Sequence, residues 1–194
     1  MTHMKRTKTE RLADLLTVLS CLMLVGDMAL ILASPALVYF RLGDPAAMSF
    51  AQLRATFAYD FDDGLGNLLR ILLREAWEQP ATLALTLFLL LCGLGAAYVL
   101  IQGIRVIAAV ADGEPFSLQN AASFRRAAAG CFFIALAAMV RTVWNIWQLG
   151  SPEPLMTYSA LLIPSFLMGG FLCLLLSALF RQAAEMKAEN DLTI

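Results

Sequence analysis

Four long apolar segments constrain what this chain can fold into. A helix needs roughly 20 apolar residues to cross the hydrocarbon core of a bilayer, and the four segments lie at about residues 12–40, 81–111, 121–149 and 155–183. Hydrophobic residues make up 60% of the chain and charged residues 15%, whereas about 25% are charged in an ordinary soluble domain. The sequence therefore predicts an all-α integral membrane protein, a four-transmembrane-helix bundle in which residues 1–194 form a single membrane domain.

Lysine and arginine residues are distributed unequally between the two sides of this predicted bundle. Nine of them lie near the span ends expected on one side, which are the start of the first span, the end of the second, the start of the third and the end of the fourth: Lys5, Arg6, Lys8, Arg11, Arg105, Arg125, Arg126, Arg181 and Lys187. Cytoplasmic loops of membrane proteins carry the excess of lysine and arginine. We therefore expect both termini in the cytoplasm (N-in/C-in), in a multi-pass protein of the bacterial cytoplasmic (inner) membrane.

The segment 41–80, between the first and second spans, is the longest stretch expected on the extracytoplasmic side. Its second half carries apolar residues at helical spacing, namely Leu65, Leu68, Leu69, Leu72, Ala76 and Trp77. Polar and charged residues occupy most of the other face. The pattern predicts an amphipathic helical segment that lies on the outer leaflet or caps the bundle.

The residue types that are scarce in the chain exclude several classes of chemistry. His3 is the single histidine, which removes histidine metal sites and Ser-His-Asp triads. The cysteines Cys21, Cys92, Cys131 and Cys173 form no CxxC pair and sit in apolar runs. They are expected to pack as small apolar residues, with a thiol sensor or soft-metal site as the alternative. We expect no catalytic residue, metal or cofactor, and the net charge of −1 argues against direct nucleic-acid binding.

Asp27 and Arg141 place charges deep inside the first and third predicted spans. At 1.5 Å per residue, Asp27 lies roughly 22 Å along its helix from the cytoplasmic end, and Arg141 lies roughly the same distance along its helix from Arg126. Because unpaired intramembrane charges are costly, the sequence predicts an Asp27–Arg141 ion pair that fixes the register of two helices. In the alternative, Arg141 reaches the outer headgroups beside Trp144 and Asp27 is protonated or hydrated separately.

The cytoplasmic connector between the second and third spans is the most distinctive stretch. Gly113 and Pro115 are expected to stop one helix, and Ser117 to cap the next. Asn120 stands where a side chain can reach back to the cap, and Phe116 where it can pack on Ala121 or Phe124. The connector motif comprises Gly113, Pro115, Phe116, Ser117, Asn120, Arg125 and Arg126. It predicts a well-formed helical hairpin, with a partner-docking surface as the functional alternative.

These residues carry a resemblance to a known family. The first motif is Gly-x-Pro-Phe-Ser-x-x-Asn followed by Arg125-Arg126, and the second is an ending with Leu179-Phe180-Arg181 and Glu189 to Ile194. Both resemble motifs of a bacterial four-span family of unknown function (domain of unknown function two-nine-seven-five). This chain has Ala183-Ala184 where the family usually has a glycine. Genes of such proteins often neighbour a gene for a small Cro-repressor-type helix-turn-helix regulator. The resemblance thus implies a membrane partner of that regulator.

Two functions remain open at this point. In the first, a non-enzymatic membrane-embedded regulatory or sensor protein interacts with the cytoplasmic helix-turn-helix regulator, using the connector and a C-terminal docking segment that includes Glu189, Asp191, Leu192 and Ile194. The alternative is a small oligomeric transporter or channel, although few polar residues lie in the spans. The expected partners are the lipid bilayer, the regulator and further copies of the chain as a homo-oligomer.

Overall fold

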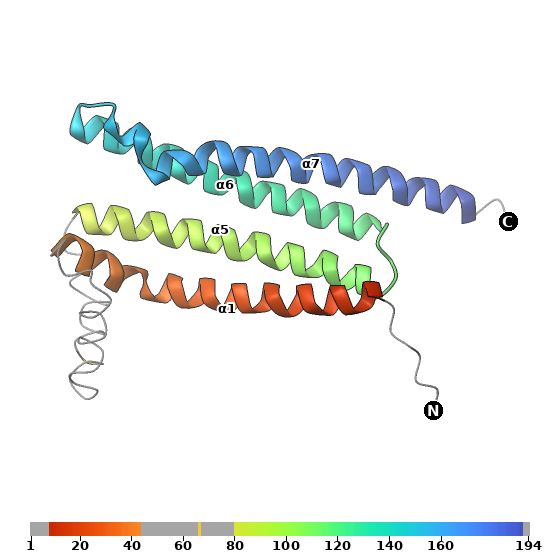
Figure 1. Ribbon diagram of the computed structural model, residues 1–194. Helices are drawn as coiled ribbons and strands as arrows, with labels where there is room; N and C mark the ends of the chain where they lie inside the picture. The colour runs from red at the N-terminus through yellow and green to blue at the C-terminus, as the bar shows by residue number, and fades with distance from the viewer. Residues whose placement is uncertain (1–7, 44–65, 67–79, 192–194) are drawn as a thin grey trace. The chain divides into compact units, whose positions relative to one another are not determined.

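The computed structural model describes residues 8–43, 66 and 80–191, and the regular structure in these ranges is helical, with no strand (Figure 1). The helices of this described part are α1 (Lys8–Gly43), α5 (Pro80–Ala111), α6 (Leu118–Leu149), the short 3-10 helix η3 (Glu153–Met156) and α7 (Tyr158–Asp191). The amphipathic helix predicted within segment 41–80 lies almost wholly outside the described residues, as do Leu192 and Ile194.

Each long helix contains a stretch that is long and apolar enough to cross a membrane. Within the described ranges, four such stretches run over Leu12–Pro35, Thr82–Ala111, Leu118–Leu149 and Ser159–Asn190. The prediction of an all-α protein with four spanning helices is therefore confirmed. The side of the membrane that each end faces, and the extracytoplasmic position of segment 41–80, stay predictions.

The fourth long helix begins and ends later than its predicted limits of 155–183. The N–H and the hydroxyl of Thr157 both donate to the Pro154 carbonyl, at 3.2 and 2.6 Å. Thr157 itself has extended backbone angles, so η3 ends there and α7 starts at Tyr158. At the other end α7 continues to Asp191, because the residues after the span include strong helix formers: Ala183, Ala184, Glu185, Met186, Lys187 and Ala188.

The chain divides into two compact units. One contains Met1–Asp27 and Leu94–Ile194, and the other contains Met28–Gly93. The first unit therefore holds α6, η3, α7 and parts of α1 and α5, and it carries the connector motif. In the second unit Val38, Thr86 and Phe88 are buried. The expectation of a single membrane domain stays a prediction.

In the first unit, α5 and α6 pack closely at two glycines. A Cβ atom added at Gly95 would lie 2.6 Å from Cγ1 of Ile134, and one added at Gly130 would lie 2.7 Å from Cγ2 of Val99. Both distances are shorter than real Cβ contacts, and Ile134 is almost completely buried. The two glycines therefore allow the helices to approach in the way typical of small residues in membrane bundles.

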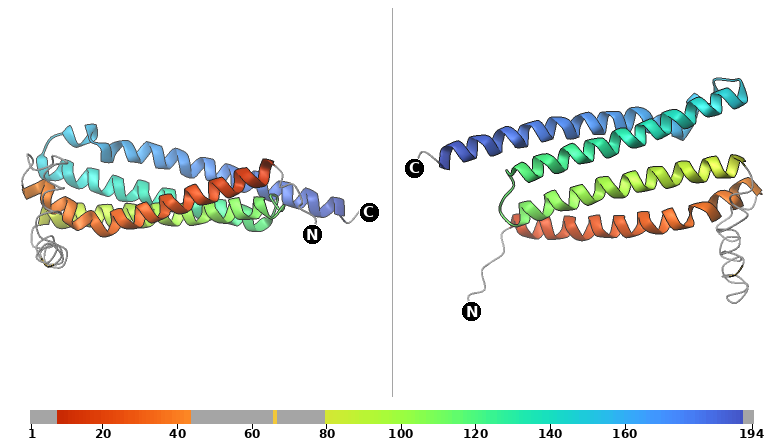
Figure 2. Two further views of the ribbon diagram at one scale, coloured as in Figure 1. Left: turned by 60° about the horizontal axis from the view of Figure 1, so that its bottom comes forward. Right: turned by 180° about the vertical axis from the view of Figure 1, so that it is seen from behind.

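On its other side α6 packs against α7, forming an antiparallel hairpin that is visible from opposite directions (Figures 1 and 2). Gly150 ends α6 with a left-handed backbone (φ 63°), and its N–H donates to the Ile146 carbonyl at 2.9 Å. Farther along, the Phe132 and Phe171 rings meet edge to face with centroids 5.4 Å apart. Because α6 contacts helices on two sides, it is the most buried spanning helix of the described part.

Candidate functional site

The end of α5 is closed by hydrogen bonds that require a glycine. The N–H of Gly113 donates to the Val110 carbonyl (3.2 Å), and the N–H of Glu114 donates to the Ala109 carbonyl (3.0 Å). This pair of bonds is a Schellman motif, which places the residue after the helix in the left-handed region. Gly113 adopts φ +81°, and Pro115 then prevents the helix from resuming. The predicted stop at Gly113 and Pro115 is confirmed.

The start of α6 is capped by Ser117, as predicted. Ser117 has extended backbone angles (φ −124°, ψ 149°), and its Oγ accepts a hydrogen bond from the Asn120 N–H at 3.2 Å. This bond satisfies one of the N–H groups that the first turn of a helix leaves without an intrahelical partner. Only three residues separate the Schellman glycine from the Ser117 cap, and α6 begins at residue 118.

Asn120 has a different role from the one that its position in the motif predicts. Its Nδ2 donates to the carbonyls of Pro115 (2.8 Å) and Glu114 (3.3 Å), so it reaches the connector rather than the backbone of the cap. The residue is 1% exposed. A buried amide that binds two successive carbonyls holds the connector in one conformation, because leaving those groups unsatisfied would be costly.

Phe116 packs on an aromatic side chain from α7 that sequence reasoning did not place there. The Phe180 ring lies 5.7 Å from the Phe116 ring and 5.0 Å from the Phe124 ring, measured between centroids. The predicted partners of Phe116 were Ala121 and Phe124, both on its own hairpin. The Leu179-Phe180-Arg181 motif was the signal in the sequence that could have indicated this contact. Pairing Phe180 with Phe116, however, requires knowing how α7 is aligned along α6.

The connector and the end of α7 form a mixed surface. Phe116 is 50% exposed and Leu118 is 61% exposed, and Arg125 and Arg126 are also exposed. Because Phe180 contacts the connector, residues 181–191 of α7 extend roughly 16 Å beyond it at 1.5 Å per residue (Figure 2). We name Phe116, Leu118 and residues 181–191 the connector surface.

The projecting end of α7 is polar. Arg181 Nε donates to Glu185 Oε1 at 2.9 Å, an ion pair between exposed side chains on successive turns. Such an exposed pair contributes little to stability because water screens it, so it leaves the charges available to another molecule. Of the predicted docking residues, Glu189 is exposed near the end of the helix and Asp191 is its last residue.

Asp27 and Arg141 both lie half-buried in their helices, α1 and α6. Solvent is excluded from Oδ2 of Asp27 and from Nε and Nη1 of Arg141. The Asp27–Arg141 ion pair itself stays a prediction.

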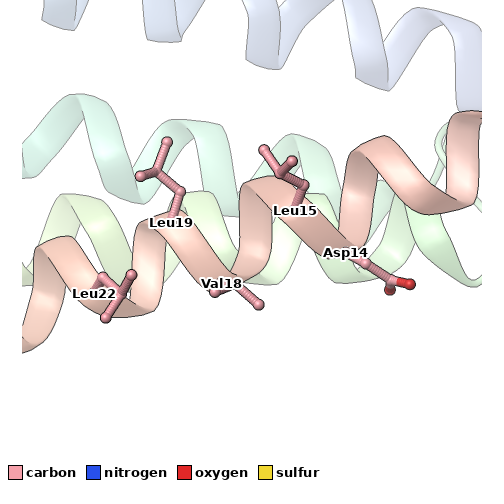
Figure 3. A pocket seen from close by; sticks show the side chains of 5 residues that line it. All are labelled: Asp14, Leu15, Val18, Leu19 and Leu22. Atoms are coloured by element: carbon pink, nitrogen blue, oxygen red, sulfur yellow. The ribbon is translucent and has the colours of Figure 1, made fainter.

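The other grooves and side-chain groups of the described residues carry little polar chemistry. Within the described ranges, no group of three metal-ligating side chains comes together. A shallow groove of about 400 Å³ runs along α1 and is lined by Asp14, Leu15, Val18, Leu19 and Leu22. Figure 3 shows the Asp14 carboxylate pointing away from Leu15 and Leu19. An apolar surface of this kind suits contact with acyl chains rather than recognition of a polar ligand.

The helices and the capped connector define the class of protein. Its spanning helices make it a multi-pass, all-α membrane protein. The chain belongs to the family described as protein of unknown function (DUF2975), which matches residues 36–194. The matched range begins inside α1 and includes the connector and all of α7. Comparison with curated proteins and with solved structures finds no match.

Proposed function

We propose that this protein is a membrane-embedded regulatory or sensor protein of the bacterial inner membrane that binds a small cytoplasmic helix-turn-helix transcription regulator. The connector surface is the docking site in this proposal, and the protein performs no catalysis. The observation that carries the proposal is Phe116, which remains 50% exposed on a connector fixed by the Asn120 side chain.

A fixed connector favours binding because little conformational entropy remains to be lost there. Burying the exposed half of the Phe116 ring would contribute on the order of 1 kcal/mol. Aromatic side chains are enriched among the residues that dominate interface energies. Phe116 therefore acts as an apolar anchor, and the polar end of α7 supplies the surrounding contacts.

The class of partner is supported by charge and by family resemblance. Arg181, Glu185, Lys187 and Glu189 place both signs of charge on the exposed end of α7. A surface that mixes one apolar anchor with charged groups is typical of non-obligate interfaces, which form and dissociate. Regulators of the helix-turn-helix class are the gene neighbours that the family resemblance implies. In the N-in/C-in orientation the connector surface faces them, while segment 41–80 faces the envelope as the sensing element.

The test is a bacterial two-hybrid assay between the full-length protein and the regulator encoded beside its gene. We expect Phe116→Ala, and separately deletion of Asp191–Ile194, to reduce the reporter signal at least severalfold. Leu136→Ala is the matched control, because Leu136 is 56% exposed and lies in the middle of α6. Membrane abundance and elution volume in detergent would show that all the variants fold.

Two results would contradict the proposal. One is an unchanged signal for both folded variants, Phe116→Ala and the Asp191–Ile194 deletion, and the other is a genome with no such regulator beside the gene. Loss of the signal in Leu136→Ala alone would place binding within the membrane. A substrate-dependent flux through vesicles containing the purified protein would instead favour the small oligomeric transporter or channel.

A further inference from the structure

Two of the four cysteines meet at the interface between α6 and α7. Cys131 is 5% exposed and Cys173 is half-buried. The Cys131 sulfur lies against α7 at Gly169, one turn from Cys173. Both are free thiols in the structure, and they are brought together from positions that are distant in the sequence.

The register of the hairpin explains why they meet. Phe124 and Cys131 are seven residues apart on α6, and Cys173 and Phe180 are seven residues apart on the antiparallel α7. Positions seven apart return to nearly the same face of a helix. The Phe124–Phe180 contact, with centroids 5.0 Å apart, therefore aligns the two cysteines two turns farther along the same interface.

A glycine brings the two backbones close at this point. Gly169 lies one turn before Cys173, and a Cβ added to it would sit 3.8 Å from the Cys131 sulfur. Because no side chain separates Cys131 from the α7 backbone, the sulfurs can approach to the roughly 2 Å of a disulfide bond with a small shift of the helices. Cys21 and Cys92 lie on α1 and α5.

The depth of the pair limits which oxidants reach it. Cys131 lies five residues after the exposed Arg126, or roughly 8 Å farther along α6, so it sits within the apolar part of the span. Charged oxidants are excluded from hydrocarbon. A quinone is apolar, dissolves in the bilayer and accepts two electrons together with two protons.

We propose that Cys131 and Cys173 are a redox-active dithiol, which a lipid-soluble quinone oxidises to a disulfide between α6 and α7. One sulfur–sulfur bond forms and two S–H bonds break. The two electrons and two protons pass to the quinone oxygens, giving the quinol. A dithiol reductant restores the two thiols by thiol–disulfide exchange and is itself oxidised to a disulfide. This activity is independent of the proposed docking of a regulator.

The test uses the full-length protein, reduced and reconstituted in lipid nanodiscs, with decylubiquinone as the probe. Every ring position of this quinone is substituted, so a thiol cannot add to the ring in place of being oxidised. After incubation the protein is denatured, and its remaining thiols are labelled with a polyethylene-glycol maleimide. Quinol formation is followed by ultraviolet absorbance, and the peptides are analysed by mass spectrometry.

We expect the wild-type protein to lose two of its four labelled thiols, to yield a Cys131–Cys173 linked peptide, and to form one quinol per disulfide. Cys131→Ser and Cys173→Ser should form no intramolecular disulfide, whereas Cys21→Ser should behave as the wild type. Full labelling of the wild type after quinone treatment would overturn the proposal. So would a linked peptide that contains Cys21 or Cys92, or oxidation by hydrogen peroxide without any oxidation by the quinone. The wild-type peptide map keeps the test decisive if a serine variant folds poorly.

Discussion

Replacing Gly95 with alanine tests the close packing of α5 on α6. The added Cβ would lie 2.6 Å from Cγ1 and 3.1 Å from Cδ1 of Ile134. Ile134 is 1% exposed, so the helices must separate or the side chain must leave its rotamer. Gly103 is the matched control because it lies on the same helix, and a Cβ there meets nothing within 4 Å.

The magnitude follows from the difference between the two variants. An alanine gains about 1 kcal/mol over glycine in a helix, and this gain is shared by both substitutions in α5. Overpacking costs about 1–3 kcal/mol and applies at Gly95 alone. We therefore expect Gly95→Ala to be less stable than Gly103→Ala by about 1–3 kcal/mol.

The assay is equilibrium unfolding in mixed micelles of increasing dodecyl sulfate content, followed by circular dichroism. The Ile134→Ala background supplies a second comparison, because it removes both atoms that the new Cβ would strike. In that background Gly95→Ala should cost no more than Gly103→Ala. Equal stability of the two glycine variants in the wild-type background would refute the packing argument.

Three further predictions concern the connector, the buried charges and the topology. Asn120→Ala should lower the free energy of unfolding by about 1–3 kcal/mol in the same micelle titration, because two carbonyls lose their donor. Asp27→Asn and Arg141→Gln should each cost about 3–5 kcal/mol if they break a buried pair, and strict additivity in the double mutant would disprove the pair. A periplasm-dependent reporter fused after Glu78 should be active and one fused after Ile194 inactive, and the reverse would overturn the assigned sidedness.

The spans and the helix ends at the connector could be predicted because both depend on local chemistry. Apolar length identifies a spanning helix without knowledge of its neighbours. Gly113, Pro115 and Ser117 act on the backbone within a few residues, so their positions in the sequence were sufficient to place the end of α5 and the start of α6. The capping roles of these residues are confirmed.

Contacts between helices could not be predicted, because they depend on how two helices are aligned along their axes. Phe116 was paired with residues of its own hairpin, and the Phe180 ring on α7 was missed. Cys131 and Cys173 were interpreted separately, since nothing in the apolar sequence around either cysteine indicates the alignment of α6 and α7 that brings them together. Asn120 was expected to face the cap, although a buried amide at this point reaches the connector carbonyls instead.

The position of α6 between two neighbours has a consequence for how the protein is made. Among the spanning helices of the described part, α6 is the least apolar and the most buried. It also carries Arg141, and an arginine in an inserting helix costs up to about 2.5–3.5 kcal/mol, the value at the helix centre, during insertion by the translocon. We therefore expect nascent α6 to stay beside the insertion machinery until α7 emerges and covers its second face. Truncations within α7 would then leave α6 incompletely inserted and exposed to the membrane proteases. Loss of α7, the last helix to be made, would therefore lead to degradation of the whole chain.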